Sequence, residues 1–580
     1  MSMKYLRGIA ASNGIAIAKV LLVQERIWEI PNRTDNDVDQ EIMRFKDAIQ
    51  KSLAELTQVY EETKSKLGED KARIFEAHML ILQDPEWVKS VVDKIQSEII
   101  NAEAALDQSV KQYIDIFELM ENEYLKERIA DIKDVGQRIM SHLLGISYLV
   151  SQITEPVVII ARDLTPSYTA QLSREYVQGF ATDIGGRTSH STIVARSMEI
   201  PAVVGLQDIT AQAENGAVII VDGIDGKVIL NPTPEVIVQY EQKRREFFKG
   251  KGSIALLVNE PTITADGHQV ELAANIGTPE DLDSCLHNGA EGVGLFRTEF
   301  LYMNRKKLPS EDEQFLAYKA VAEGMKGKPV TIRTLDVGGD KELPYLNLEK
   351  EMNPFLGYRA IRLCLDQQEI FQTQIRAILR ASHYGKVKMM YPMISSLSEV
   401  RQANALVAQV KEELDSRNIP YDHEMEVGIM VEIPACALIA DELAREVDFF
   451  SIGTNDLIQY TMAVDRLNEK ISYLYQPFHP AVLRLIQMVI EAAHRQNKRV
   501  AMCGEMAGDP FAAPILLGLG LDEFSMSAPS LLGLRQLLRG LNFQEMRVLA
   551  QEALKLDSQE EIKELIKNSL QGKLQRVNYS

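Results

Sequence analysis

The chain has 580 residues, of which 46% are hydrophobic and 25% charged, and its formal net charge is −20. This length predicts several domains, each with an ordinary globular core. The negative charge argues against a nucleic-acid binder, which needs a basic face for the phosphates, and leaves room for a basic protein partner.

The opening residues, 8–23, read as two short strands around a Ser-Asn-Gly turn. Long runs with an apolar period of 3.6 then predict a helical bundle with a helical hairpin. Strand-like runs return afterwards and alternate with short helices, which is an α/β pattern. Because the opening strands lack partners unless they join this later block, we expect one α/β domain, 1–22 and 148–230, with the bundle, 23–147, inserted into it.

Residues 233–250 predict a charged linking helix inside a linker that spans 231–259. The pattern changes over 260–575, where helical stretches separate eight short strand-like segments. Eight successive β/α units in about 310 residues indicate a TIM (β/α)8 barrel. The strand-like segments lie at 271–276, 292–296, 330–335, 387–392, 426–431, 449–453, 499–503 and 523–527.

The cysteines and the first residues bear on the compartment. The four cysteines, at 285, 364, 436 and 503, lie far apart without a CxxC pair, which favours reduced, cytoplasmic usage over disulfides or a zinc site. The first twenty residues lack the apolar core of a signal peptide, and no run approaches the ~20 apolar residues of a membrane span. We expect a cytoplasmic enzyme without membrane insertion.

Barrels of this kind carry their active sites at the carboxyl ends of the strands. Arginine forks match phosphate and carboxylate oxygens, and two carboxylates with phosphate oxygens are a common Mg²⁺ arrangement. The pattern therefore predicts a small phosphate-bearing anion bound through Mg²⁺, with a thiol as a proton donor. The residues at those ends are Arg297, Arg333, Glu432, Asn455, Asp456, Arg466 and Cys503.

Each of these residues has a structural explanation when it is taken singly. An arginine or a carboxylate at a strand end is usually in an ion pair, and Cys503 is by itself a small core residue. Their co-location at one rim favours a functional site, because unpaired buried charge is expensive.

A histidine in the α/β block stands in an unusual setting, "GGRTSHSTIVARSMEIP", residues 185–201. A short helix over 189–197 would place His190 in its first turn, where backbone N–H groups and the helix dipole favour an anion. Gly185 and Gly186 permit close approach. The spacing is compatible with a phosphoryl acceptor, and equally with a capping histidine or a phosphate binder.

Several motifs together carry a family resemblance. "GGRTSHSTIVAR" and "DFFSIGTNDLIQYTMAVDR" (448–466) resemble the two signatures of the phosphoenolpyruvate-utilising enzymes. With "GIAASNGIAIAK", "IFEAHMLILQDPEW" (74–87) and "YLKERIADIKDVGQRI" (124–139), the whole chain resembles the enzyme I group of the bacterial sugar phosphotransferase system.

The resemblance implies a reaction and a role for each site residue. His190 attacks the phosphorus of phosphoenolpyruvate through Nε2, and Cys503 protonates the enolate carbon to give pyruvate. Thr169 orients His190, and Glu432 and Asp456 hold Mg²⁺. Substrate binding falls to Arg297, Arg333, Arg359, Asn455, Asp456 and Arg466.

The resemblance also implies partners. A swivelling phosphohistidine domain would carry the phosphoryl group to a histidine of the carrier protein HPr, and the barrel would form a homodimer. The hairpin over 60–86 is acidic, which suits a basic partner, although an ordinary solvated helix face looks the same. Its candidate contact residues are Glu69, Asp70, Glu76 and Asp84.

Two rival functions remain at this point. Pyruvate phosphate dikinase and phosphoenolpyruvate synthase share both signatures, but they need a large ATP-binding domain that about 110 helical residues cannot supply. A signalling scaffold could bind phosphoenolpyruvate without turnover, and the complete set of catalytic residue types weighs against it.

Overall fold

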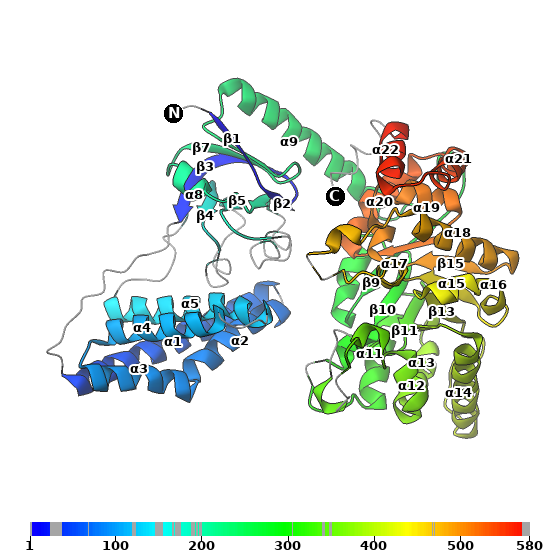
Figure 1. The fold of residues 1–580 in the computed structure, drawn as a ribbon, viewed down its shortest axis with the longest axis horizontal. Helices are drawn as coiled ribbons and strands as arrows, with labels where there is room; N and C mark the ends of the chain where they lie inside the picture. The colour runs from blue at the N-terminus through cyan, green and yellow to red at the C-terminus, as the bar shows by residue number, and fades with distance from the viewer. Residues whose placement is uncertain are drawn as a thin grey trace. The chain divides into compact units, whose positions relative to one another are not determined.

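The computed structural model describes most of the chain as two compact units, Met1–Phe248 and Lys249–Ser580, each of which is described by itself (Figure 1). The described residues are 3–23, 37–67, 69–118, 123–145, 153, 155–164, 168, 176–186, 192, 195, 200–303, 305–338, 343–346, 351–466, 468 and 470–570.

The first unit contains a mixed β-sheet with the strand order β1-β8-β7-β3-β4-β5-β6-β2 among its described residues (Figure 1). Strand β3 pairs antiparallel with β7 and parallel with β4, so the opening strands do join the later block as predicted. The strands are β1 (Lys4–Arg7), β2 (Ile9–Ser12), β3 (Ile15–Val23), β4 (Val157–Ala161), β5 (Val177–Thr182), β6 (Ala202–Val204), β7 (Val218–Asp222) and β8 (Lys227–Leu230). A short helix, α8 (Ile209–Gln212), lies between β6 and β7 in the chain.

Strand β1 is an addition to the prediction. It pairs antiparallel with β8 at the edge of the sheet, and most of its residues are exposed. A short and mostly solvated edge strand leaves no apolar alternation in the sequence, which is the signal that indicates a strand. Its partner β8, which is four residues long, was not predicted either.

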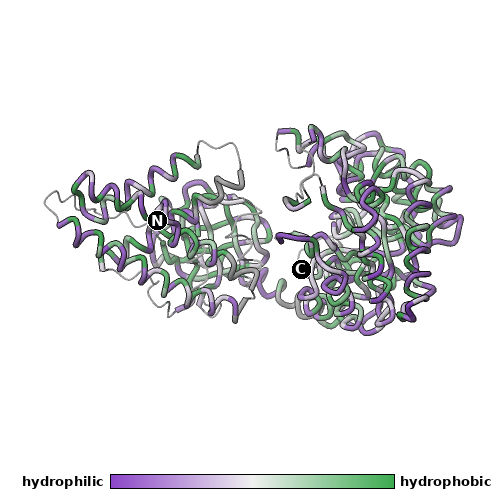
Figure 2. Tube along the Cα trace, turned by 90° about the horizontal axis from the view of Figure 1, so that it is seen from below, coloured by the Kyte–Doolittle hydropathy of each residue, from purple (hydrophilic) through white to green (hydrophobic). Residues whose placement is uncertain are grey.

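The predicted helical bundle follows β3 in the chain and precedes β4, its parallel neighbour in the sheet, so the bundle is an insertion between two paired strands. Hydrophilic and hydrophobic residues form stripes along its helices (Figure 2). The hydrophobic stripes meet in a core that includes Phe45, Leu56, Phe75, Trp87 and Ile139. The helices are α1 (Val38–Leu67), α2 (Glu69–Gln83), α3 (Pro85–Glu98), α4 (Ala102–Glu118) and α5 (Glu123–Leu144).

Helix α3 begins with strong local signals. The Asp84 carboxylate accepts hydrogen bonds from the backbone N–H groups of Glu86, at 2.8 Å, and Trp87, at 3.2 Å. Pro85 occupies the first helical position, where its missing N–H costs nothing. The acidic residue that the sequence analysis assigned to a partner surface is therefore also the N-cap of α3.

The second unit is a closed parallel barrel, with the strand order β10-β11-β12-β13-β14-β15-β16-β9 among the described residues. All eight predicted strand-like segments are strands of this barrel. Their bounds are β9 (Glu271–Ile276), β10 (Gly292–Arg297), β11 (Val330–Arg333), β12 (Val387–Tyr391), β13 (Val427–Val431), β14 (Phe449–Ile452), β15 (Arg499–Met502) and β16 (Glu523–Met526).

Helices separate the barrel strands along the chain, and capping boxes mark two of their starts, at Ser310 with Glu313 and at Ser396 with Glu399. The helices of the second unit include α10 (Leu282–His287), α11 (Glu311–Gly324), α12 (Ile361–Asp366), α13 (Gln368–Ser382), α14 (Leu397–Ser416), α15 (Pro434–Leu438), α16 (Ala440–Leu443), α17 (Thr454–Met462), α18 (Pro480–Arg495), α19 (Ala513–Leu519), α20 (Leu531–Arg539), α21 (Phe543–Ala553) and α22 (Gln559–Ser569). The predicted linking helix is α9 (Pro234–Ala255), which extends past residue 250.

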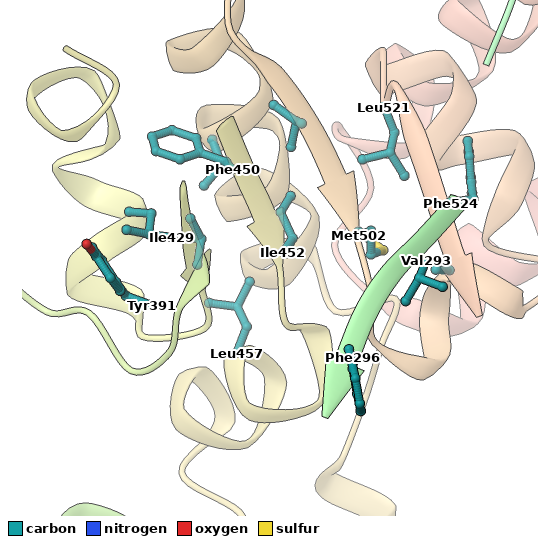
Figure 3. Packing of buried hydrophobic residues seen from close by; sticks show 14 of the residues in the cluster. Val293, Phe296, Tyr391, Ile429, Phe450, Ile452, Leu457, Met502, Leu521 and Phe524 are labelled. Atoms are coloured by element: carbon teal, nitrogen blue, oxygen red, sulfur yellow. The ribbon is translucent and has the colours of Figure 1, made fainter. Parts of the chain in front are cut away.

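The barrel strands are apolar on both faces, as buried parallel strands usually are. Phe450, Ile452 and Phe524 belong to the large core that the strands share with the surrounding helices (Figure 3). The alternate residues form a small separate cluster: Leu295, Met390, Met430, Phe449 and Cys503. Because side chains alternate along a strand, this small cluster is the filling of the barrel itself.

We predict that the Asp84 cap stabilises the bundle independently of its charge. Asp84→Ala should lower the bundle's free energy of unfolding by about 1 kcal/mol, whereas Asp84→Asn, an equally good cap, should retain it. The measurement is urea unfolding of the full chain by tryptophan fluorescence in a Trp28→Phe background, so that buried Trp87 reports. Equal midpoints for the alanine variant and its parent would contradict the capping role.

Candidate active site

The carboxyl ends of the barrel strands carry the residues that the sequence analysis selected. Arg297 and Arg333 are the last residues of β10 and β11, and Glu432 and Cys503 directly follow β13 and β15. Asn455 and Asp456 lie in the first turn of α17, after β14. Enzymes with this barrel fold bind their substrates at the carboxyl ends of the strands.

A buried carboxylate holds two of the arginines together. Asp336 forms an ion pair with Arg333, with 3.0 Å between Nη1 and Oδ2, and its Oδ1 accepts a hydrogen bond from Arg359 Nη2 at 2.8 Å. Arg333 also donates through Nη2 to Glu299 Oε1 at 2.7 Å. All four side chains are almost fully buried, so each charge depends on its partners.

Arg297 differs from these two arginines. It is half-buried, and its guanidinium makes no hydrogen bond or ion pair with any residue that the structure describes. Its charge acts on the nearby Cys503 thiol. A guanidinium that has no protein carboxylate nearby is available for the oxygens of an anionic ligand.

The two predicted metal ligands lie close to each other. Glu432 is buried and its Oε1 accepts from the backbone N–H of Met393 at 2.6 Å. Burial raises the pKa of Glu432 well above its usual range, and the negative charges of Asp456 and Asp336 add to the effect. Asp456 Oδ1 lies 3.8 Å from Arg359 Nη1. Two carboxylates that repel each other in this way suit a bound cation.

Cys503 faces the barrel interior and is 4% exposed. Its backbone N–H donates to the carbonyl of Ile452 at 3.1 Å, and its Sγ lies 3.8 Å from the same oxygen. Burial raises the pKa of the thiol to about 11. The thiol therefore keeps its proton at neutral pH, as a proton donor must.

The remaining barrel candidates meet at Glu505. Asn455 accepts from the Glu505 backbone N–H at 3.0 Å and donates to Glu505 Oε1 at 3.4 Å. Arg466 Nη1 lies 4.0 Å from the same carboxylate oxygen. The structure thus brings all eight barrel candidates to one end, while their chemical roles remain predictions.

Two candidates of the α/β block, His190 and Thr169, lie outside the described residues. The strand before the histidine motif ends at Thr182, ahead of the two glycines. Thr192 is buried and its Oγ1 donates to the carbonyl of Gly186 at 2.8 Å. This hydrogen bond joins the two described residues that flank the segment 187–191.

The acidic residues proposed for a partner surface belong to α2 and to the start of α3. Glu76 and Asp84 are exposed. The side chains of Glu69 and Asp70, at the start of α2, lie outside the described set.

Sequence reasoning missed several polar residues of this site. Glu299 and Asp336 balance the buried arginines, and Asn275 of β9 donates to the carbonyl of Cys503 at 2.9 Å. Glu299 stands two residues after Arg297 in "FRTEF", and Asp336 stands three after Arg333 in "TIRTLD". Carboxylates so near strand-end arginines were a readable signal, whereas the contact of Asn275 spans 228 residues.

Comparisons with known proteins show the family of the chain. Residues 251–543 match the family described as PEP-utilising enzyme, PEP-binding domain. Residues 7–128 match PEP-utilising enzyme, N-terminal, and residues 153–226 match PEP-utilising enzyme, mobile domain.

Proteins similar over nearly their whole length share one name. The chain is 59% identical to the phosphoenolpyruvate-protein phosphotransferase of Geobacillus stearothermophilus, with 98% of both chains covered. It is 56% identical to that of Bacillus subtilis (strain 168), covering 98% of this chain and 100% of that one. A solution structure titled as Enzyme I (nEIt) is 43% identical, with a TM-score of 0.37, and covers 42% of this chain and 99% of that one.

The barrel and the three family matches define the class, a phosphoenolpyruvate-utilising enzyme. Within that class the chain belongs to the family of the phosphoenolpyruvate-protein phosphotransferases.

None of the helices in the described part of the chain is long and apolar enough to cross a membrane.

We predict that Cys503 is alkylated with an unusual pH dependence. Only the thiolate reacts with iodoacetamide, so the rate at Cys503 should keep rising toward pH 11 in the folded chain. In the urea-unfolded chain the rate should level off above the ordinary thiol pKa of about 8.5. Mass spectrometry of the peptide that contains Cys503 measures both rates. A folded-state rate that levels off near pH 9 would contradict the raised pKa.

Proposed function

We propose that this enzyme transfers the phosphoryl group of phosphoenolpyruvate to its own His190 and then to a histidine of the carrier protein HPr, with release of pyruvate. The observation that supports this most directly is the barrel end itself. It combines Arg297, which has no hydrogen bond or ion pair with any described residue, with two buried arginines already held in place and a protonated thiol. Phosphoryl transfer needs mainly positioning and charge neutralisation, which this arrangement supplies.

The arginines divide the substrate between them. Arg297, Arg333, Arg359 and Arg466 bind the phosphate and carboxylate oxygens, and Asn455 assists them. Arg333 and Arg359 are fixed by Asp336 before substrate arrives, so binding costs them little side-chain entropy. Arg297, which has no partner among the described residues, can form new hydrogen bonds as charge develops on the transferring phosphoryl group.

Glu432 and Asp456 are the residues that would hold Mg²⁺. Burial and the negative charge of Asp456 raise the pKa of Glu432, and a divalent cation held by the two carboxylates would favour their charged forms. The phosphate of the substrate completes the oxygen ligands that Mg²⁺ prefers. When bound, the ion neutralises charge on the transferring phosphoryl group.

The proposed reaction has two steps. Nε2 of His190 forms a bond to phosphorus while the bond from phosphorus to the enol oxygen breaks, which leaves the enolate of pyruvate. The Cys503 thiol then gives its proton to the methylene carbon of that enolate, and water restores the thiol. Thr169 orients His190 for attack.

The proposed role of each domain follows from this reaction. Residues 1–22 and 148–230 form the phosphohistidine domain, and residues 260–575 form the barrel that binds phosphoenolpyruvate and makes the homodimer. The bundle, 23–147, binds HPr through an acidic surface that includes Glu76. His190 and the barrel residues belong to different units, so the phosphohistidine domain swivels, with the linker 231–259 as the hinge element. The phosphoryl transfer takes place in the cytoplasm.

The first prediction from this proposal concerns the phosphate carrier. Labelled phosphoenolpyruvate with Mg²⁺ should place acid-labile label on the wild-type chain, and added HPr should remove it. The His190→Ala variant should stay unlabelled, and chelation of Mg²⁺ should abolish labelling of the wild type. If neither the wild-type chain nor His190→Ala is labelled, the result favours a scaffold that binds phosphoenolpyruvate without turnover. If both are labelled, another residue carries the phosphate.

The second prediction concerns Arg297. Arg297→Ala should slow the phosphorylation of His190 about 100- to 1,000-fold, as loss of one well-placed donor costs ~3–4 kcal/mol of barrier. Rapid-quench labelling measures the rate. The control is Arg417→Ala. Arg417 is exposed, pairs with Glu413 one helical turn away and is none of the candidate site residues, so the rate should stay unchanged. An unaltered rate in the Arg297 variant would refute its role.

A further inference from the structure

The pairing between two barrel strands stops just before the thiol. Strands β15 and β16 pair at Ala501 with Glu523 and at Met502 with Phe524, and the described pairing goes no further. Cys503 is the next residue on β15's side, and Ser525 is the next on the other. Backbone groups beyond the end of a ladder need other partners.

The side chain of Asn275, on β9, provides hydrogen bonds to the backbone where this ladder ends. Its Nδ2 donates to the carbonyl of Cys503 at 2.9 Å and to the carbonyl of Ser525 at 3.3 Å. Its Oδ1 accepts from the hydroxyl of Ser525 at 2.6 Å. The hydroxyl therefore fixes which end of the amide faces the two carbonyls.

Cys503 is consequently held from both sides. On one side its N–H and Sγ meet the carbonyl of Ile452 on β14. On the other side its carbonyl meets Asn275. The chain beyond it is confined as well, because a Cβ on Gly504 would lie 1.8 Å from Thr454 Oγ1. Without Asn275, the Cys503 carbonyl would lose the partner that sets the direction of its peptide.

We propose that Asn275 is a positioning residue for Cys503 and that Ser525 fixes the orientation of the Asn275 amide. This inference rests on the proposed function, in which the Cys503 thiol protonates the enolate. Asn275 touches neither the thiol's sulfur nor the other candidate site side chains in any contact that the structure records. It acts by holding the Cys503 peptide, so that the thiol proton reaches one face of the enolate.

The test uses the stereochemistry of the product. Phosphoenolpyruvate carrying deuterium at one of its two methylene positions, turned over in tritiated water with HPr present, yields pyruvate with a chiral methyl group. A fixed thiol protonates one face and gives one enantiomer. Water that protonates a released or unguarded enolate reaches both faces and gives a racemic methyl group.

Four variants of the full chain separate the possible outcomes. Cys503→Ala should give racemic pyruvate. Asn275→Ala should lose most of the enantiomeric excess and lower kcat about tenfold to 100-fold, with the KM for phosphoenolpyruvate within about twofold of wild type, because displacement by ~1 Å costs such factors. Ser525→Ala should show a smaller loss. Asn404→Ala, which removes an amide that bonds Tyr391 and the Glu446 carbonyl, should match wild type.

The results distinguish two failures. Racemic pyruvate from Cys503→Ala together with full enantiomeric purity from Asn275→Ala would overturn the positioning role and leave the proposed function intact. Full purity from Cys503→Ala would instead overturn the proton-donor assignment itself. If Asn275→Ala does not fold, Ser525→Ala decides, and its full purity would overturn the proposal. A raised KM with slowed phosphorylation of His190 in Asn275→Ala would show a general structural role, and it would also overturn the proposal.

Discussion

The active end of the barrel depends on the placement of Asp336 between Arg333 and Arg359. Two guanidinium groups buried side by side repel each other, and a single buried charge without a partner costs several kcal/mol. The carboxylate of Asp336 relieves both problems, and Glu299 supports Arg333 from its other side. The network lets the fold keep two buried guanidinium groups in fixed positions, where their remaining N–H groups can serve as donors to an anion.

This network also explains why the arginines of the site are not equivalent. A guanidinium already paired with a carboxylate has little net charge to offer, and it serves as a rigid fork of donors. Arg297, which has no such partner among the described residues, offers its full charge. The pKa of Glu432 is raised mainly by burial, and the negative charges of Asp456 and Asp336 add to the effect, so negative charge at this position is poorly compensated. An anionic substrate and a divalent cation together correct both imbalances.

Most of the fold could be predicted from the sequence, because the periodicity of its hydrophobic residues indicates helices and strands. Every barrel strand was a short apolar segment, and the bundle helices keep the 3.6 period over as many as 30 residues. The sequence did not reveal β1, because this edge strand buries little. The strand-end residues were readable through the rule that barrels place chemistry at one end. Asp336 could have been found, because it stands only three residues after Arg333. Asn275 could not, because its contact with Cys503 spans 228 residues and no local pattern records it. Asp84 shows a different limit, since one acidic residue satisfies both a capping pattern and a docking pattern.

The burial of Cys503 sets two requirements that one environment must meet. Burial raises the pKa of the thiol and keeps it protonated, as donation requires. The same burial removes the water that could deliver a proton in its place, so the outcome depends on where the sulfur points. A side chain with one rotatable bond to its sulfur takes its direction from the backbone. The backbone at Cys503 lies beyond the end of its ladder with β16, where strand pairing no longer fixes it on that side. Precision at this position therefore has to come from side chains, and the amide of Asn275 is placed to supply it.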